Sequence, residues 1–155
     1  MSRLHRVVYV SRWSNVLGED TEAALHRIVA VSIGNNRTCD VTGLLVTHEG
    51  WFLQAIEGPE VSVAALIARI VRDPRHRCVR VLSQGPADAR LFQDWNMVGA
   101  RLSPDADPLL VELGQVARFD GHALDAKGAL HLLVFAADAR RRRERAGLAG
   151  LAGCA

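Results

Sequence analysis

The chain has 155 residues, of which 49% are apolar, so it is long and hydrophobic enough to bury one core. Its formal net charge of +2 argues against the long basic stripe of a protein that binds nucleic acid. The three cysteines, Cys39, Cys78 and Cys154, lie too far apart for a metal or redox motif. We therefore expect one folded domain with reduced thiols and no metal site.

The ends and the apolar runs of the chain carry no targeting signal. No apolar run approaches the ~18 residues that span a membrane. Residues Met1 to Arg6 lack the charged-then-apolar pattern of a signal peptide. These features predict a cytoplasmic protein without a membrane partner.

The first part of the chain predicts a strand followed by a helix. β-Branched residues are concentrated in Leu4 to Ser11, which is typical of a strand. After a polar loop, Asp20 or Thr21 can cap a helix that ends near Asn36.

Two strands follow, Val41 to His48 and Trp51 to Glu57, and the acidic residue and glycine between them favour a tight hairpin. That turn sets a register in which Leu45 lies opposite Gln54. Both faces of the hairpin are apolar, so both must be covered. We expect Leu124 to Phe135 to cover the face that the central helices leave open.

A second helix should begin after Pro59 and stop before Pro74, because the residue before a proline avoids the helical conformation. Strands at Cys78 to Leu82 and Trp95 to Leu102 would complete the sheet. The order β-α-β-β-α-β-β predicts an α+β, ferredoxin-like mixed sheet with both helices on one face, to which C-terminal helices are added.

The region after Ser103 differs in character. Pro108 to Val116 and Leu124 to Arg143 are predicted helices, and five arginines near the end of the second favour the negative end of its dipole. We divide the chain into a globular domain at 1–102, a helical cap at 103–146 and a flexible tail at 147–155.

Three polar residues occupy positions where packing alone favours hydrocarbon. Gln54 lies between Phe52 and Ile56 on one strand face, Asn36 falls in the apolar stripe of the first helix, and Tyr9 alternates with valines. Burying an amide without hydrogen bonds costs roughly 2 kcal/mol or more. Each could be a satisfied core group or face solvent, but together they could line a cleft that binds a flat heteroaromatic ligand.

Five segments in a fixed order carry a more specific signal than any one of them alone. The segments are VVYVSR at 7–12, NNRTCDVTGLL at 35–45, FLQAIEGPE at 52–60, RIVRDPRHRCVRVL at 69–82 and FQDWNM at 92–97. Together they resemble the BLUF family, the sensors of blue light using FAD, over about Leu4 to Leu102. The loop after the first strand looks longer than is usual in that family.

The resemblance implies roles for individual residues. Tyr9 and Gln54 match the family's photoactive pair, and Trp95 and Met97 match a pair that exchanges positions during signalling. The residues that match flavin-binding positions are Tyr9, Ser32, Asn35, Asn36, Gln54, Arg69, Asp73 and His76. Three of these have plainer alternatives: Arg69 and Asp73 could form a surface ion pair, and His76 could be a solvated loop residue.

The resemblance also implies a function, that of a blue-light receptor and not an enzyme, which holds FAD or FMN without a covalent bond. Light would draw an electron and a proton from Tyr9 through Gln54, and the rearranged hydrogen bonds would shift absorption to the red. The fifth strand would then carry the change to the C-terminal helices. Because little chain follows Leu102, we expect a separate signalling protein, and also a homo-oligomer.

Two other functions stay open at this point. A flavin-free interaction module could share the fold, although intact Tyr9, Asn36 and Gln54 argue against it. RNA-recognition modules have the same order of elements, but they need paired aromatic residues on their central strands. Binding to nucleic acid is therefore not expected.

Overall fold

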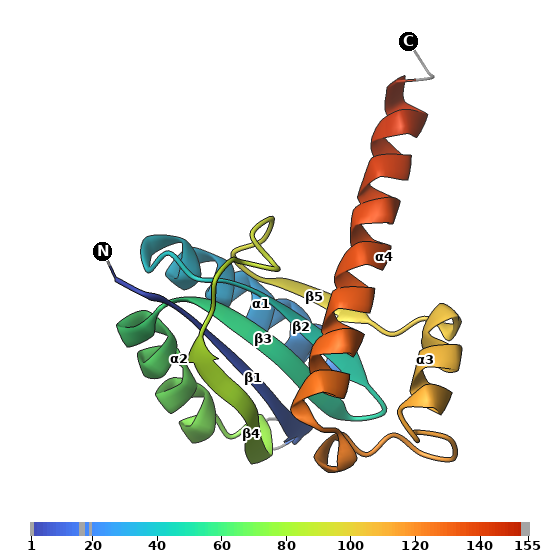
Figure 1. The fold of residues 1–155 in the computed structure, drawn as a ribbon, viewed down its shortest axis with the longest axis horizontal. Coiled ribbons are helices and arrows are strands. Elements are labelled where there is room, and N and C mark those ends of the chain that lie inside the picture. The colour runs from blue at the N-terminus through green and yellow to red at the C-terminus, as the bar shows by residue number, and fades with distance from the viewer. Residues whose placement is uncertain (1, 16–17, 19, 153–155) are drawn as a thin grey trace.

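Five strands and the helices between them make up the described part of the chain, residues 2–15, 18 and 20–152, in the computed structural model (Figure 1). The strands are β1 (Leu4–Trp13), β2 (Thr42–His48), β3 (Trp51–Pro59), β4 (His76–Pro86) and β5 (Val98–Arg101). The helices are α1 (Thr21–Thr38), α2 (Glu60–Arg72), α3 (Asp107–Glu112) and α4 (Ala126–Ala152), with short 3-10 turns η1 (Pro104–Ala106) and η2 (Gly121–Ala123).

The strands form one mixed sheet in the order β4-β1-β3-β2-β5. Neighbouring strands pair antiparallel except for β5, which runs parallel to β2. Helices α1 and α2 lie on one face of this sheet, and α4 crosses the other face (Figure 1). This is the predicted ferredoxin-like α+β arrangement with C-terminal helices added.

The hairpin of β2 and β3 has the predicted register, with Leu45 opposite Gln54. Its two turn residues, Glu49 and Gly50, have φ values of 46° and 78°. Positive φ at both central positions is what a type I′ turn requires, and that turn matches the twist of the flanking strands. The turn therefore fixes which residues of β3 point to each face.

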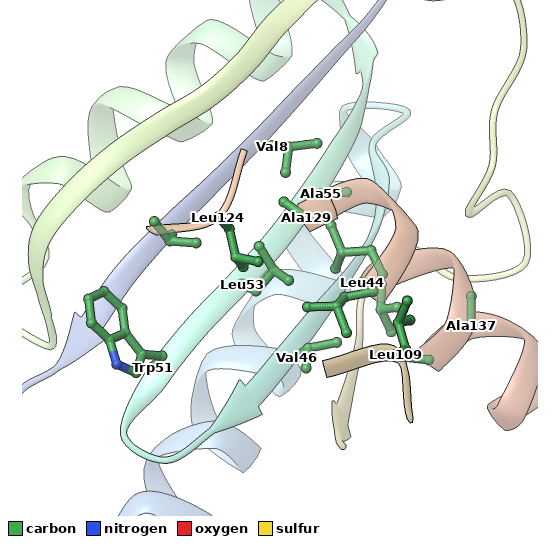
Figure 2. Packing of buried hydrophobic residues seen from close by; sticks show 14 of the residues in the cluster. Val8, Leu44, Val46, Trp51, Leu53, Ala55, Leu109, Leu124, Ala129 and Ala137 are labelled. Carbon is green, nitrogen blue, oxygen red and sulfur yellow. The ribbon is translucent and has the colours of Figure 1, made fainter. Parts of the chain in front are cut away.

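The α4 face of the sheet carries one continuous apolar cluster, which Figure 2 shows from close by. Leu124, Leu132 and Leu133 pack there against Leu44 and Leu53. The expectation that Leu124 to Phe135 covers this face is confirmed. The opposite face has two separate clusters, one beneath each of the helices α1 and α2.

The start of α1 is capped as the sequence predicts. The carboxylate of Asp20 accepts a hydrogen bond of 2.8 Å from the backbone N–H of Ala23, which satisfies one free donor of the first turn. The loop before it, which looks long for the family, lies partly outside the described residues. Cys39 and Cys78 are free and exposed. Cys154 lies outside the described residues.

The last strand is shorter than predicted. Because β5 begins only at Val98, Trp95 and Met97 lie in the loop before it, and the prediction of a strand that starts at Trp95 is wrong. The chain turns there: the N–H of Trp95 bonds to the carbonyl of Phe92, and the carbonyl of Trp95 accepts from Gly43. Because of this turn, the side chains of Trp95 and Met97 lie on different faces of the sheet.

The C-terminal helices also differ from expectation. Helix α4 does not end at Arg143 but continues to Ala152, because the alanines and leucines there favour a helix strongly enough to carry it past the two glycines Gly147 and Gly150. Residues 153–155 lie outside the described part. Helix α3 is shorter than expected, since Gly114, with a φ of 76°, follows its end. No helix in the described residues is long and apolar enough to cross a bilayer.

Gly43 on β2 should not tolerate even a methyl group. A Cβ there would lie 2.4 Å from the backbone oxygen of Ala55, which the sheet holds in place. We expect Gly43→Ala to lower the free energy of unfolding by about 1–3 kcal/mol, measured by urea denaturation. Gly34→Ala in α1 is the matched control, since nothing lies within 4 Å of its Cβ; a loss of stability in both variants would contradict the steric argument.

Candidate functional site

A cleft of about 170 Å³ opens between α1 and α2 on the sheet face where the apolar core is divided. Each helix covers its own cluster, and the space between the clusters is floored by polar side chains. The predicted binding residues that line the cleft are Ser32, Asn35, Asn36, Gln54, Arg69, Asp73 and His76. The structure therefore brings together seven residues from four segments of the chain.

Gln54 is the central polar group of this floor, with only 3% of its surface exposed. Its carbonyl oxygen accepts a hydrogen bond from the hydroxyl of Tyr9, which lies directly opposite on β1. Its amide nitrogen donates to the sulfur of Met97 at 3.2 Å. Because sulfur is a weak acceptor, this second bond holds the amide only loosely.

Tyr9 does not line the cleft but is fully buried behind Gln54. Burial, and to a smaller extent the negative charge of Asp73, raise the pKa of the Tyr9 phenol far above its ordinary value. The phenol therefore stays protonated and donates to Gln54. A phenol of this kind releases its proton readily only together with an electron.

Asn36 reaches the same floor from the end of α1 and is 3% exposed. Its amide nitrogen donates to the carbonyl of Asn96 at 2.7 Å, and Asn96 donates in turn to the carbonyl of Val41 at 3.1 Å. Among the residues that the structure describes, no donor reaches the side-chain oxygen of Asn36. The oxygen of Asn36 and the second N–H of Gln54 are thus two buried polar groups to which no partner is given by the described residues.

The other two residues of α1 play smaller parts at the rim. The hydroxyl of Ser32 donates to the carbonyl of Ile28 within the helix at 2.6 Å, which leaves its lone pairs available. Asn35 is exposed at the mouth of the cleft. Both line the cleft, next to the exposed apolar side chain of Val31.

Asp73, at the end of α2, is bound by Arg75. Asp73 accepts from the guanidinium of Arg75, with contacts of 3.0 and 2.6 Å, so the ion pair with Arg69 considered from the sequence is not formed. Burial acts to raise the pKa of Asp73, but the bonds from Arg75 outweigh it and hold that pKa below its ordinary value. Arg69 is exposed at the cleft, and no acid in the described part of the chain pairs with it.

His76 is a buried wall of the cleft, only 7% exposed, so the alternative of a solvated loop residue is wrong. Its Nδ1 shares a hydrogen bond of 2.8 Å with the hydroxyl of Ser11, and its ring lies against Phe52 with centroids 4.9 Å apart. Burial lowers the pKa of His76 from its ordinary 6.5 to about 4. At neutral pH the cleft therefore faces a neutral imidazole.

His76 should make the protein less stable in acid. Between pH 6.5 and about 4 the unfolded chain binds a proton at this position and the native imidazole does not. The free energy of unfolding should therefore fall by about 3 kcal/mol as the pH drops through that window. Urea denaturation at several pH values measures this slope. His76→Gln should flatten it, and equal slopes in the two proteins would contradict the assignment.

Met97 and Trp95 point to opposite sides of the sheet. Met97 is buried beside the cleft with Ile28 and Phe52, in contact with the amide of Gln54. Trp95 packs against the cluster under α4, where the guanidinium of Arg141 lies 5.0 Å from its ring. Met97 is therefore the nearer of the two to the cleft.

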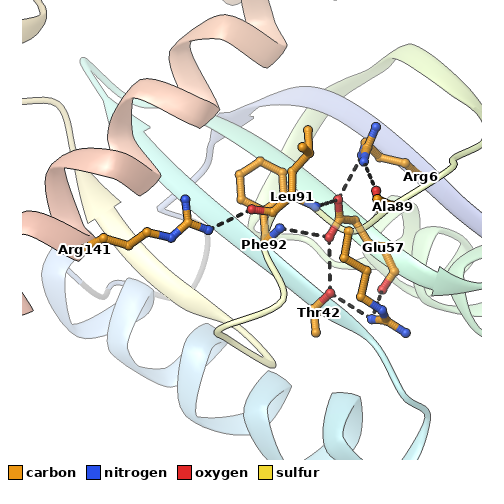
Figure 3. Close-up of polar contacts among 8 residues, drawn as sticks. Arg6, Thr42, Glu57, Ala89, Leu91, Phe92 and Arg141 are labelled. Carbon is orange, nitrogen blue, oxygen red and sulfur yellow. Dashed lines mark hydrogen bonds and ion pairs between the residues drawn. The ribbon is translucent and has the colours of Figure 1, made fainter.

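The segment that carries both residues is anchored by a buried carboxylate (Figure 3). Glu57 is fully buried and accepts from the backbone N–H groups of Leu91 and Phe92 at 2.7 and 3.1 Å. It also accepts from Arg6 at 2.9 Å and from Thr42 at 3.3 Å. These bonds hold the start of the segment in place and so help to position Met97 beside Gln54.

Glu57, Arg75 and Ser11 were not predicted from the sequence. A signal for Glu57 was present, because strand alternation places it in the row of Trp51 and Ala55, where a carboxylate needs partners. Arg75 stands only two residues after Asp73, so its ion pair is a local contact. Ser11 acts through His76, 65 positions away, which only the fold brings near it.

The residues of the cleft fit a flat heteroaromatic ligand with carbonyl and ring-nitrogen groups. The free N–H of Gln54 needs an acceptor, and the free oxygen of Asn36 needs a donor. Apolar side chains of Ile28, Leu66 and Ile70 line the walls between them. A flavin ring offers both kinds of polar group along one edge of an apolar plane.

Comparison with known proteins points to the same kind of ligand. A family model described as sensors of blue-light using FAD matches residues 4–98. A photoactivated adenylate cyclase subunit beta of Euglena gracilis is 36% identical over 97 residues, which are 62% of this chain and 11% of the relative. The chain thus spans a small part of the length of that relative.

Two solved structures extend the likeness over most of the chain. The dark-state structure of BlrB, described as a BLUF protein, has a TM-score of 0.71 at 26% identity and covers 90% of this chain and 98% of that one. The photo-activated state of BlsA has a TM-score of 0.77, covering 84% and 94% of the two chains. At 23% identity, the second comparison supports the fold alone.

Proposed function

The chain belongs to the BLUF family, the sensors of blue light that use a flavin, and from that premise we propose that the cleft between α1 and α2 binds FAD non-covalently. The observation that carries the proposal is the buried amide of Gln54, which joins Tyr9 on one side and offers an unpaired N–H to the cleft on the other. Asn36 would bind the ring edge beside it. His76 and Ile28 would pack against the ring.

FAD, as in the family description, is our assignment for the ligand, and FMN is the alternative. Arg69 is exposed at the cleft without an acidic partner among the described residues, which suits a flavin phosphate in either case. Arg75 is held on Asp73 and would instead shape the wall.

When bound, the flavin supplies the absorption of blue light and the oxidising power of the excited state. Tyr9 would be the donor of an electron and a proton to that excited state, with the proton leaving along its hydrogen bond to Gln54. Because Met97 binds the amide nitrogen of Gln54 only weakly, that amide could rearrange at little cost. Tyr9 would regain both, so the lasting change would lie in the hydrogen bonds of Gln54.

The rearranged amide would signal through the segment at 91–97. A Gln54 side chain that no longer donates to Met97 changes the packing of that buried residue. The same segment contacts α4 through Trp95 and Arg141. We propose that this two-state change reaches a separate signalling protein or a second copy of the chain.

Absorption spectroscopy tests the proposal directly. The purified protein should be yellow, and blue light should shift its absorption to the red, with return in the dark. Chromatography of the flavin released by denaturation distinguishes FAD from FMN. A colourless protein that binds neither added flavin would overturn the proposal and favour the flavin-free interaction module.

A further inference from the structure

A groove of about 590 Å³ lies on the other side of the molecule, between α4 and the segment at 90–95. One wall presents Arg141, Arg145 and Leu148, which share one face of the helix at spacings of four and three residues. The opposite wall presents Leu91 and Trp95. The groove is thus formed by the segment that leads to Met97 and by the helix that follows the domain.

Arg141 holds the two walls together. Its guanidinium donates to the carboxylate of Asp94 at 2.7 Å and to the carbonyl of Leu91 at 2.8 Å (Figure 3 shows the second bond), and it lies over the ring of Trp95. The hydrogen bond to Asp94 raises the pKa of Arg141 above its ordinary value. A shift of the segment at 91–97 must therefore alter the groove.

Beyond Arg141, helix α4 buries no side chain against the rest of the described chain. Side chains 142–148 are all exposed, and this part of α4 projects past the sheet (Figure 1). Leu148 is 68% exposed, and Leu91 on the facing wall is 36% exposed. Short isolated helices are marginal in water, so a partner that packs against this stretch would stabilise it.

The positive charge of residues 140–148 indicates that the partner is acidic. Residues 140–148 contain five arginines and one glutamate, a net charge of +4. Arg142, Arg143 and Arg145 have no acidic partner among the residues that the structure describes. Arg145 is the one of these three that lines the groove, so acidic side chains on the partner would pair with it, and an apolar residue would fill the space between the two leucines.

Two other occupants fit less well. The arginines at 142, 143 and 145 point to different sides of the helix and do not form the continuous stripe that a nucleic-acid backbone follows. A second copy that packed α4 against α4 would bring two stretches of charge +4 together. Within the groove, Asp94 is paired with Arg141, and Glu144 is paired with Arg140. Arg145 therefore remains as a cation without an acidic partner among the described residues, beside the exposed leucines, which suits an amphipathic acidic protein segment.

We propose that this groove docks an acidic, leucine-bearing segment of a partner protein, and that light changes its affinity for that segment. The inference rests on the proposed function, since light acts on the groove only through Gln54 and Met97. Beyond the proposed function, it identifies where the partner binds and which side chains the partner must present.

Fluorescence anisotropy tests the inference with two labelled peptides of about 14 residues, roughly four helical turns. One has leucine at every third or fourth position and glutamate elsewhere, and the other has lysine in place of glutamate. The label is excited in the red, so that the readout does not drive the photocycle. Binding is measured in the dark and under blue light.

Two charge reversals on the same helix provide a matched pair. Arg145→Glu changes a residue of the groove wall, whereas Arg143→Glu changes one about half a turn away from Arg141. Both are exposed, so neither should affect folding. We expect Arg145→Glu to lower the affinity for the acidic peptide about tenfold, and Arg143→Glu to lower it no more than about twofold. The affinity of the unmodified protein should differ between light and dark.

Several results would overturn the inference. Equal weakening by the two reversals would show diffuse attraction, and equal affinity for both peptides would remove the charge requirement. Tighter binding of single-stranded DNA would make the helix a nucleic-acid surface, and conversion of a dimer to a monomer by Arg145→Glu would make it a self-association surface. Identical affinities in light and dark, with a normal red shift, would refute this inference alone; a missing red shift would refute the proposed function.

Discussion

Gln54→Leu should give a protein that still binds flavin but shows no red shift under blue light. Leucine keeps most of the apolar contact that Gln54 makes with the floor of the cleft. It removes the acceptor for the Tyr9 hydroxyl and the N–H that faces the cleft, so no amide is left to rearrange. The measurement is the difference between absorption spectra before and during illumination, and a normal shift would refute the mechanism.

The companion variants separate loss of signal from loss of structure. Gln54→Leu leaves the buried hydroxyl of Tyr9 without an acceptor, which should cost about 1–3 kcal/mol of stability. Tyr9→Phe combined with Gln54→Leu removes both groups and should recover part of that loss. Tyr9→Phe alone should also abolish the normal photocycle, whereas Gln84→Leu on exposed β4 should leave it intact.

The sequence predicted the parts of the fold that local rules determine. The acidic residue and glycine of the hairpin set the register, and the register placed Gln54 and Leu45 opposite each other. Alternation then showed that both sheet faces were apolar, from which the position of α4 followed. Alternation also placed the polar residue Gln54 in an apolar row. Because a buried amide needs a hydrogen-bond partner, this position predicted the cleft.

What the sequence did not predict depends on contacts between distant segments. A strand over Trp95 to Leu102 fits local propensity, but the turn at Phe92 and the bond from Gly43 override it. The route by which Met97 faces the cleft and Trp95 faces α4 therefore became visible only in the structure. The hydrogen bond from Arg141 to the carbonyl of Leu91 joins residues 50 positions apart in the sequence. No periodicity in the sequence indicates such a contact.

The second large effect should come from Glu57. Its carboxylate is fully buried and satisfies the backbone N–H groups of Leu91 and Phe92 as well as the side chains of Arg6 and Thr42. Leucine at this position would leave those donors buried without acceptors. We expect Glu57→Leu to lower the free energy of unfolding by about 3–5 kcal/mol, measured by urea denaturation.

Glu57→Gln should fall between the wild type and the leucine variant, because an amide offers one oxygen where the carboxylate offers two. Glu112→Gln, on the exposed side of α3, is the control and should change stability by less than about 0.5 kcal/mol. Hydrogen exchange adds a local readout. If Glu57 anchors the segment that holds Met97, the amides of Leu91 and Phe92 should lose protection in both Glu57 variants; full protection there would show that the segment is held by other contacts.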